Sequence, residues 1–387
     1  MTAFSLFAVT APGLEPFTTQ ELTDLGLLPA QTHAPPGEAG GVAFEGDRRA
    51  LYRANLHLRT ATRVLMRLGE FYAAAFSELR KKAARLPWEL YLTPGQPVAI
   101  RATCHKSRLY HSDAVAERMA GAIEDRLGQP SARRKPASDS DEAASDAALV
   151  IVRLVHDLCT VSLDTSGAPL FQRGYRLATA KAPLRETLAA GLVLASGWDR
   201  RSPLLDPFCG SGTLPIEAAL LARNMAPGRG RRFAFMDWPG YNAPLWARLL
   251  VEADARRLGP PPRLLGSDRD AGAIAAAEAN AERAGVAGDV EFTRCAVSSI
   301  APPPDLGWVV TNPPYGVRVS ENQELRNLYA RFGQVLHARC PGWQVSVLSS
   351  DDRLLHSTGL SFEPERSLAL VNGGLKVKLA RGRVPGR

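Results

Sequence analysis

Apolar and polar positions in the first 165 residues form short segments of strand and helix character that alternate along the chain. Phe4 to Val9 is an apolar run typical of a strand, and the amphipathic run Glu15 to Leu25 predicts a helix. Pro97 to Thr103 and Ala148 to Val155 predict further strands, whereas the apolar spacing of Asn55 to Leu68 fits either a helix or a strand.

The pattern changes after residue 182, where a strand, a glycine-containing turn and a helix follow one another and then repeat. That order is typical of a parallel sheet with crossover helices. The interval Arg223 to Arg257 is longer than a simple crossover needs, so we expect an excursion with a helix of its own. Near the end, Ser367 to Val371 and Leu375 to Leu379 flank Asn372 and Gly373, which predicts an antiparallel hairpin.

Two segments interrupt these patterns. Gln129 to Ala147 has no aromatic or large aliphatic residue, which predicts a mobile, solvated insertion. Because a buried strand is expected directly after it, the insertion interrupts a domain rather than ending one. Asp164 to Ala182 contains glycine, proline and basic residues without periodicity and is expected to be an interdomain linker.

Composition limits the class of protein. The 387 residues are 45% hydrophobic, enough for two or three domains with their own cores. The longest stretch without a charged residue, Met1 to Leu14, is too short to span a bilayer and lacks the basic flank of a secretory signal. The five cysteines include no pair within four residues, so neither a zinc site nor a disulfide framework is predicted. We expect an intracellular protein with free thiols and no metal.

The net charge of +8 makes a polyanionic partner plausible. The segment Arg48 to His111 holds thirteen basic and three acidic residues, whereas the residues before it hold six acidic residues and no Lys or Arg. A GC-rich genome would also produce such an excess of arginine, since Lys accounts for seven of the 47 basic residues. The uneven placement of the charge is therefore more informative than the total.

A glycine-containing turn follows an apolar strand within Ser202 to Leu221. Asp206 ends the strand, and Gly210 and Gly212 would let the backbone approach a ligand before a helix begins. An acid in first position suits a cationic ligand end better than a pyrophosphate, and no third glycine or lysine is present for phosphate.

A second acid, Asp268, follows the expected strand Arg263 to Ser267. A carboxylate at this strand end can accept both ribose hydroxyls of a nucleoside. Either acid alone could equally be a helix cap or a solvated turn residue. The two acids on either side of one glycine turn predict a site for a nucleoside with a cationic group.

The segment Trp308 to Val317 predicts a buried strand that runs into Asn312, Pro313, Pro314 and Tyr315. Consecutive prolines make a rigid loop that offers carbonyl acceptors. The Asn312 side-chain oxygen and the Pro313 carbonyl could accept both hydrogens of an exocyclic amine and aim its nitrogen at an electrophilic methyl group, with Tyr315 stacked on the base. No general base is needed, because the amine becomes acidic once it has attacked. The alternative is an ordinary proline-rich turn.

These motifs resemble those of the bacterial THUMP-domain RNA guanine-N2-methyltransferases. DPFCGSGT at Asp206 to Thr213, GSD at Gly266 to Asp268 and NPPYG at Asn312 to Gly316 are similar to that family. Similar segments also lie outside these motifs: Asn55 to Leu65, Cys104 to His111, Asp164 to Arg176, Ala182 to Trp198 and Phe235 to Trp246. The resemblance covers nearly the whole chain except Gln129 to Ala147.

The resemblance implies an α/β protein with three parts. A ferredoxin-like piece (1–60) and an α+β THUMP domain (61–165, with the insertion 129–147) would precede a linker (166–182) and a Rossmann-like class I methyltransferase domain (183–387). The implied cofactor is S-adenosyl-L-methionine, held by Asp206, Phe208, Cys209, Gly210, Ser211, Gly212, Thr213, Asp268 and Arg269. The family also has an acid near the adenine ring, but the corresponding segment here, Arg294 to Val297, has none.

The implied substrate is the N2 amine of a guanosine in structured RNA, flipped out of its stack to reach Asn312. The Trp-containing segment Phe235 to Trp246 favours large-subunit ribosomal RNA over tRNA. A DNA adenine or protein glutamine methyltransferase and a non-catalytic RNA-binding protein remain alternatives. We expect a cytoplasmic monomer without membrane contact, whose RNA-binding candidates are Arg59, Arg63, Lys106, Arg108, Tyr110, Arg173 and Arg176.

Overall fold

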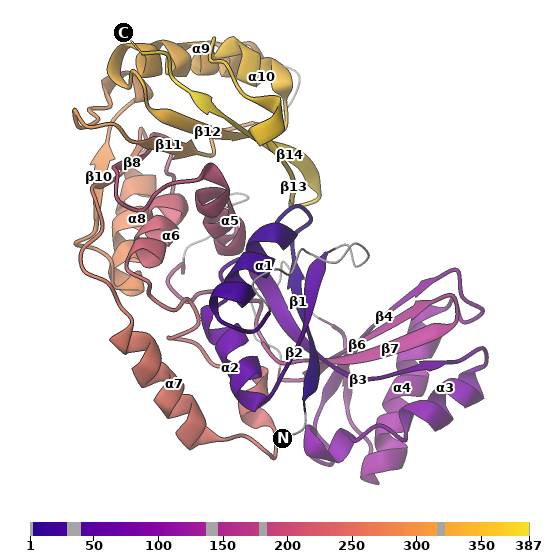
Figure 1. Cartoon of the computed structure of the whole chain (residues 1–387). Helices are drawn as coiled ribbons and strands as arrows, with labels where there is room; N and C mark the ends of the chain where they lie inside the picture. The colour runs from indigo at the N-terminus through magenta and orange to yellow at the C-terminus, as the bar shows by residue number, and fades with distance from the viewer. Residues whose placement is uncertain (1–2, 29–39, 137–145, 178–183, 316–321, 387) are drawn as a thin grey trace. The chain divides into compact units, whose positions relative to one another are not determined.

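Contacts between residues divide the chain into two units in the computed structural model, which describes residues 3–28, 40–136, 146–177, 184–315 and 322–386 (Figure 1). The first unit comprises Met1–Thr10, Thr18–Gln172 and Gly228–Glu252. The second comprises Ala11–Phe17, Arg173–Pro227 and Ala253–Arg387. None of the helices described is both long and apolar enough to cross a membrane.

The first unit contains one mixed sheet, in the strand order β2-β1-β3-β7-β6-β4-β5 over the described residues. Strands β4 and β6 run parallel, while β3, β7 and β6 are successive antiparallel neighbours. The strands are β1 (Phe4–Thr10), β2 (Gly41–Gly46), β3 (Ala61–Tyr72), β4 (Val98–His105), β5 (Arg133–Arg134), β6 (Ala148–Val155) and β7 (Leu158–Asp164).

The segment that fits either a helix or a strand contains parts of both. Helix α2 (Arg48–His57) begins after Asp47, whose side chain accepts a hydrogen bond from the Ala50 amide at 2.9 Å. Strand β3 begins four residues after α2 ends and pairs with β1 along its first half and with β7 along its second half. One continuous sheet therefore joins the expected ferredoxin-like piece to the expected THUMP domain.

Helices α3 (Phe76–Ala83) and α4 (Ser112–Leu127) bury apolar side chains in the core that strands β4, β6 and β7 also line. The strands expected at Pro97 to Thr103 and Ala148 to Val155 are confirmed as β4 and β6. Within the expected insertion, Arg133 and Arg134 pair with Val98 and Ala99 at the edge of the sheet. Residues 137–145 lie outside the described part of the chain, so the mobility expected for the insertion stays a prediction.

The excursion between Arg223 and Arg257 does contain a helix, α7 (Ala243–Ala255). Its segment Gly228–Glu252 belongs by contacts to the first unit, although it lies within the span expected to be the methyltransferase domain. The Phe235 ring stacks on Tyr52 of α2 at 4.3 Å between centroids, and the Tyr52 hydroxyl accepts a hydrogen bond from the Asn242 amide at 3.0 Å. Aromatic packing explains this placement, because buried aromatic rings contribute large apolar areas.

The second unit contains a sheet of order β10-β9-β8-β11-β12-β14-β13 among the described residues. The first five strands in this order are parallel, and β14 is antiparallel to both β12 and β13, which confirms the expected parallel sheet and hairpin. The strands are β8 (Leu204–Asp206), β9 (Leu264–Asp268), β10 (Val290–Arg294), β11 (Trp308–Thr311), β12 (Gln344–Ser349), β13 (Leu368–Asn372) and β14 (Leu375–Arg383).

Helices cover both faces of this sheet. Leu204 and Val310 point into a core with α5 (Glu186–Ser196), α6 (Thr213–Ala222) and α8 (Ala271–Ala284). Their neighbours Leu205 and Val309 point into a second core with α9 (Asn322–Arg339) and α10 (Asp352–Ser357). Successive residues of a strand project to opposite faces, so the apolar runs at these strands are buried on both sides, as in doubly covered parallel sheets.

Candidate functional site

The polar residues predicted to bind a ligand lie at the carboxyl ends of three neighbouring strands. Asp268 ends β9, Asp206 ends β8, and Thr311 ends β11, with Asn312 directly after it. Since β9, β8 and β11 are adjacent and parallel, these ends meet at one edge of the sheet. The strand order also reverses beside β8, and such a switch point is where open α/β sheets bind ligands.

The glycine turn between β8 and α6 depends on two left-handed residues, Gly210 at φ +52° and Gly212 at φ +82°. A Cβ atom at Gly212 would approach Ala277 Cβ and Phe292 Cζ to 2.9 Å, so this glycine lets the turn pack against its neighbours. A Cβ atom at Gly210 would meet no atom within 4 Å among the described residues. The turn therefore faces open space at Gly210, directly before the amino end of α6.

Asp206 is buried, with 1% of its surface exposed. Its Oδ1 atom accepts hydrogen bonds from Thr311 Oγ1 at 2.6 Å and from the Phe208 amide at 3.1 Å. The pKa of this carboxyl is raised to about 7, chiefly by burial and in smaller part by the nearby Asp268, while the two hydrogen bonds act to lower it. A cationic group bound beside Asp206 would stabilise the ionised form, as the sequence predicts for this position.

Asp268, at the same edge, is half-buried and is hydrogen-bonded to the glycine turn. Its Oδ2 atom accepts a hydrogen bond from the Gly210 amide at 3.1 Å, and its Oδ1 atom accepts one from the Asp270 amide at 2.9 Å. Each carboxylate oxygen can accept a second donor, which leaves capacity for two hydroxyl groups of a ligand. The structure thus brings Asp206, Gly210 and Asp268 together.

The other predicted cofactor residues divide into buried and exposed groups. Cys209 and Thr213 are buried, and burial raises the pKa of the Cys209 thiol above its ordinary range. The Phe208 ring packs edge-on against Phe332 at 5.4 Å, and the Ser211 carbonyl accepts a hydrogen bond from Asn280 Nδ2 at 3.0 Å. Arg269 is exposed directly after Asp268.

Asn312 offers the hydrogen-bond acceptor that the proline-rich loop was expected to provide for an amine. Its Oδ1 atom is buried and has no hydrogen-bond partner among the described residues. Pro313 is buried, the Pro314 carbonyl accepts a hydrogen bond from the Tyr329 hydroxyl at 3.3 Å, and the Tyr315 hydroxyl accepts one from Asn372 Nδ2 at 3.0 Å. A buried acceptor without a donor is costly and calls for an explanation, of which a catalytic or ligand-binding role is one.

Four of the arginines predicted to contact RNA have structural partners instead. Arg63 is 8% exposed and donates to Asp164 Oδ2 and to the Gly167 carbonyl, both at 2.6 Å. Arg59 is buried and lies beside Glu21. In the second unit, Arg173 is buried beside Glu217, and Arg176 donates to Glu186 at 3.1 Å. Burial and ion pairing give these side chains structural roles and limit what a nucleic acid can reach, which argues against RNA contact at these four positions.

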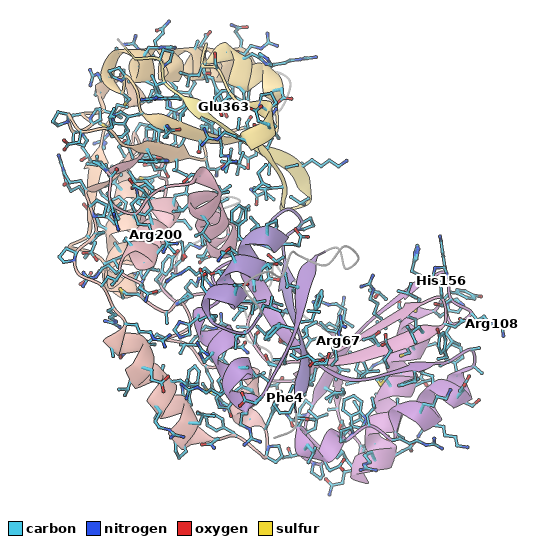
Figure 2. The ribbon with its side chains drawn as sticks, viewed as in Figure 1. Phe4, Arg67, Arg108, His156, Arg200 and Glu363 are labelled. Carbon is cyan, nitrogen blue, oxygen red and sulfur yellow. The ribbon has the colours of Figure 1, made fainter. Side chains whose placement is uncertain are left out.

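The remaining RNA-binding candidates, Lys106, Arg108 and Tyr110, lie on the segment between β4 and α4, which is bonded to the turn between β6 and β7. Figure 2 shows Arg108 on the first of these segments and His156 on the second. The Arg108 side chain is 77% exposed. The Arg108 amide donates to Asp157 Oδ1 at 2.6 Å, which fastens one turn to the other. Tyr110 is 70% exposed, and its ring lies 4.1 Å from that of His111. Lys106, Arg108 and Tyr110 thus form an exposed cationic and aromatic tip.

Sequence reasoning missed three side chains that hold the site. Thr311 donates to Asp206, Tyr329 donates to Pro314, and Asn372 donates to Tyr315. Thr311 had a local signal, because it is the polar last residue of an apolar strand. Tyr329 and Asn372 had none, since each lies on a different element from its partner.

Comparisons with protein families match most of the chain. Residues 173–380 match the family described as RMKL-like, methyltransferase domain. Residues 5–65 match the RlmL ferredoxin-like domain, and residues 73–164 match the THUMP domain. The matched segments follow the order expected from the sequence.

Similar proteins agree with these matches. The ribosomal RNA large subunit methyltransferase K/L of Syntrophotalea carbinolica is 38% identical over 96% of this chain and 53% of its own length. This chain spans about half the length of three such K/L proteins. SMU.472, crystallised as a complex with SAH, is 30% identical with a TM-score of 0.85, covering 100% of this chain and 99% of its own. A Listeria monocytogenes protein described as a predicted N6-adenine-specific DNA methylase is 34% identical with a TM-score of 0.84, covering 98% and 96%.

Proposed function

The chain belongs to the RMKL-like methyltransferase family, and on that basis we propose that it transfers a methyl group from S-adenosyl-L-methionine to the N2 amine of a guanosine in structured RNA. Large-subunit ribosomal RNA is the favoured substrate, because the K/L relatives are named for it and match 96–97% of this chain. The class I fold with ferredoxin-like and THUMP parts agrees with this activity.

The observation that carries the proposal is the buried Asn312 oxygen, which accepts no hydrogen bond from any residue that the structure describes. It lies directly after β11, whose neighbour β8 ends in Asp206, so an amine acceptor stands beside a carboxylate suited to a cationic cofactor. An aromatic amine is a poor nucleophile because its lone pair is delocalised. Acceptance of its N–H hydrogens by Asn312 and the Pro313 carbonyl would localise charge on nitrogen and orient it.

The bonds and protons of the methyl transfer can be accounted for without a general base. A bound cofactor would supply the methyl group and keep the electrons of the broken sulfur–carbon bond as a neutral thioether, while the N2 lone pair would form the new nitrogen–carbon bond. The methylated nitrogen is then strongly acidic and releases one proton through the Asn312 acceptor to water. The residues of this chain supply position and electrostatics rather than a base.

The residues present fit the cofactor. Asp206 would hold the ammonium of the methionine end, Gly210 and Gly212 would admit it closely, and Asp268 would accept the ribose hydroxyls. Bound there, the cofactor supplies an electrophilic methyl group. The segment Arg294 to Val297 offers no carboxylate for adenine, which leaves backbone groups and apolar contacts such as those of Val297.

RNA contact is assigned to the exposed tip formed by Lys106, Arg108 and Tyr110. Cationic groups contact phosphates and aromatic rings stack on unpaired bases, so this combination suits single-stranded or looped RNA. We further propose that the protein acts as a monomer in the cytoplasm.

Four alternatives to this substrate or activity can be compared. A tRNA substrate would use the same THUMP-containing half and the same loop. DNA adenine methylation is favoured by the name of the Listeria relative and needs the same amine acceptor, as does protein glutamine methylation. The RlmL ferredoxin-like and THUMP matches favour RNA over both. A non-catalytic RNA-binding role would leave the buried Asn312 oxygen without a purpose.

A labelling experiment tests the proposal. The purified protein and tritiated S-adenosyl-L-methionine are incubated with RNA from cells that lack the gene, and the RNA is digested to nucleosides. We expect label in N2-methylguanosine from large-subunit ribosomal RNA. Label in tRNA instead would identify tRNA as the substrate. Label in DNA or protein alone would refute the RNA function. A protein that neither labels a substrate nor binds the cofactor would favour the non-catalytic role.

A further inference from the structure

The β13–β14 hairpin lies at the edge of the second sheet (Figure 1). Leu370 is paired with Val377, and Asn372 is paired with Leu375 at the end of the hairpin. Residues directly opposite one another project to the same face, and so do residues two apart in one strand. Leu375 therefore lies in the same row as Leu370 and Val377.

The exposed fraction of the side chains rises sharply at the end of this row. Leu370 is 3% exposed and Val377 is 4% exposed, whereas Leu375 is 55% exposed. Exposing a large aliphatic side chain to water at the tip of a hairpin is unfavourable in free energy. Its exposure suggests contact with an apolar or aromatic surface in the functional state.

The turn at the tip is formed by two glycines. Gly373 and Gly374 have φ values of +56° and +86°, and they are the two residues between the paired positions Asn372 and Leu375. A two-residue turn with positive φ at both positions matches the twist of an antiparallel hairpin. The pairing of the two strands therefore places Leu375 opposite Asn372.

That place is beside the proposed amine-binding loop. Asn372 Nδ2 donates to the Tyr315 hydroxyl at 3.0 Å, and Tyr315 follows Asn312 by three residues. Burial raises the pKa of Tyr315, so its hydroxyl is neutral and accepts the Asn372 hydrogen bond at physiological pH. Leu375, across the turn from Asn372, shares the hairpin face that contacts Tyr315.

We propose that Leu375 enters the RNA base stack at the position left by the extruded target guanosine. The inference rests on the proposed function and adds a residue that makes the paired target accessible. Extrusion costs the stacking and pairing of the flipped base, and an apolar wedge between neighbouring bases offsets part of that cost. Tyr315 would stack on the extruded base while Leu375 fills the gap behind it.

Leu306 provides a matched control. It is 59% exposed and lies just before Trp308, at the opposite end of β11 from Asn312. Replacing either leucine with alanine removes the same exposed side chain. The two variants thus differ in their distance from the site and not in chemistry.

The test uses stem–loop RNAs in which the mapped target position is either paired or unpaired. Each RNA is made with guanosine at that position for methylation rates and with 2-aminopurine in its place for fluorescence. Wild-type protein should raise 2-aminopurine fluorescence in the paired probe RNA and methylate both guanosine-containing RNAs. Leu375→Ala should lose the fluorescence rise and lower kcat on the paired RNA about tenfold or more, as expected when a stacking contact is lost. Its kcat on the unpaired RNA should change less than about threefold.

Leu306→Ala should match the wild type on both RNAs, and Leu375→Met should restore most of the lost rate. Equal rates for Leu375→Ala and wild type on the paired RNA would overturn the wedge, and so would equal losses on paired and unpaired RNA. A wild-type protein that labels no RNA would refute the proposed function itself, and the wedge with it. Failure of the wedge alone would leave wild-type methylation intact.

Discussion

Thr311 Oγ1 donates a 2.6 Å hydrogen bond to Asp206 Oδ1, which ties the last residue of β11 to the last residue of β8. Asn312, the proposed amine acceptor, is the next residue after Thr311. The bond therefore links the strand end that would hold the cofactor to the one that would hold the substrate amine. Both groups are buried, so water cannot replace either partner.

Replacing Thr311 with Val should weaken cofactor binding while leaving the fold intact. Valine has nearly the same shape but cannot donate, and a buried acceptor deprived of its donor costs about 1–3 kcal/mol. Titration calorimetry with S-adenosylhomocysteine should show a Kd increase of about tenfold or more. Thr311→Ser keeps the hydroxyl and serves as the control; equal affinity in the valine variant would show that the bond does not support the site.

Cofactor affinity should depend on pH through Asp206, whose pKa is raised to about 7 by burial. Above pH 7 the carboxylate is ionised and ready for an ammonium group. Below pH 7 it must lose a proton before it can pair, so the Kd should rise by up to about tenfold per pH unit. Calorimetry between pH 5.5 and 8 measures the slope, and Asp206→Asn should bind weakly with no such slope.

The raised pKa of Asp206 also predicts that Asp206→Asn, which should weaken cofactor binding, increases the stability of the protein without cofactor. The folded-state pKa lies above the ordinary value of 3.8, so the folded protein binds more protons than the unfolded chain between these values and loses stability as pH rises from about 4 to about 7. Asparagine cannot ionise. At pH 8 this variant should be more stable than wild type on the order of a few kcal/mol, with little difference at pH 4; urea unfolding measures both, and an unchanged difference across this range would contradict the assignment.

Asn312→Ala should abolish transfer while cofactor binding stays nearly intact. Loss of one preorganised acceptor typically lowers kcat by about 100-fold to 1000-fold, and the proposed cofactor contacts come from other residues. Asp268→Ala should show the reverse order, with a higher cofactor Kd as its first defect. Single-turnover methylation and calorimetry on both variants separate the two roles; full activity in both would contradict the site.

Replacing Arg63 should reduce the stability of the protein, whereas replacing Arg108 should reduce its affinity for RNA. Arg63→Leu leaves Asp164 buried without its cation and should cost about 3–5 kcal/mol of stability. Arg108→Ala should leave the melting temperature unchanged but weaken RNA binding and lower its salt dependence by about one phosphate contact. Thermal unfolding and filter binding at several salt concentrations test the pair. A stable Arg63→Leu variant with reduced RNA affinity would restore the original prediction for that residue.

The chemistry of the site could be predicted from sequence because each motif is local. An acid before a glycine turn, the Asn-Pro-Pro-Tyr loop after an apolar strand and the two glycines of the last hairpin each depend on residues within a few positions. Backbone geometry at such positions follows from the residues themselves, since glycine permits positive φ and proline fixes φ. The order of a parallel sheet followed by a hairpin could be predicted for the same reason.

Contacts between distant residues were decided by the tertiary structure. Arg63 and Asp164 are 101 residues apart, Asn372 and Tyr315 are 57 apart, and Asn242 and Tyr52 are 190 apart. A basic segment that looks like a nucleic-acid surface in sequence becomes partly a set of buried ion pairs, because whether a charge faces solvent depends on what packs over it. The sequence by itself determined which groups can react; the packing of the chain decided which of them are held together and which reach the surface.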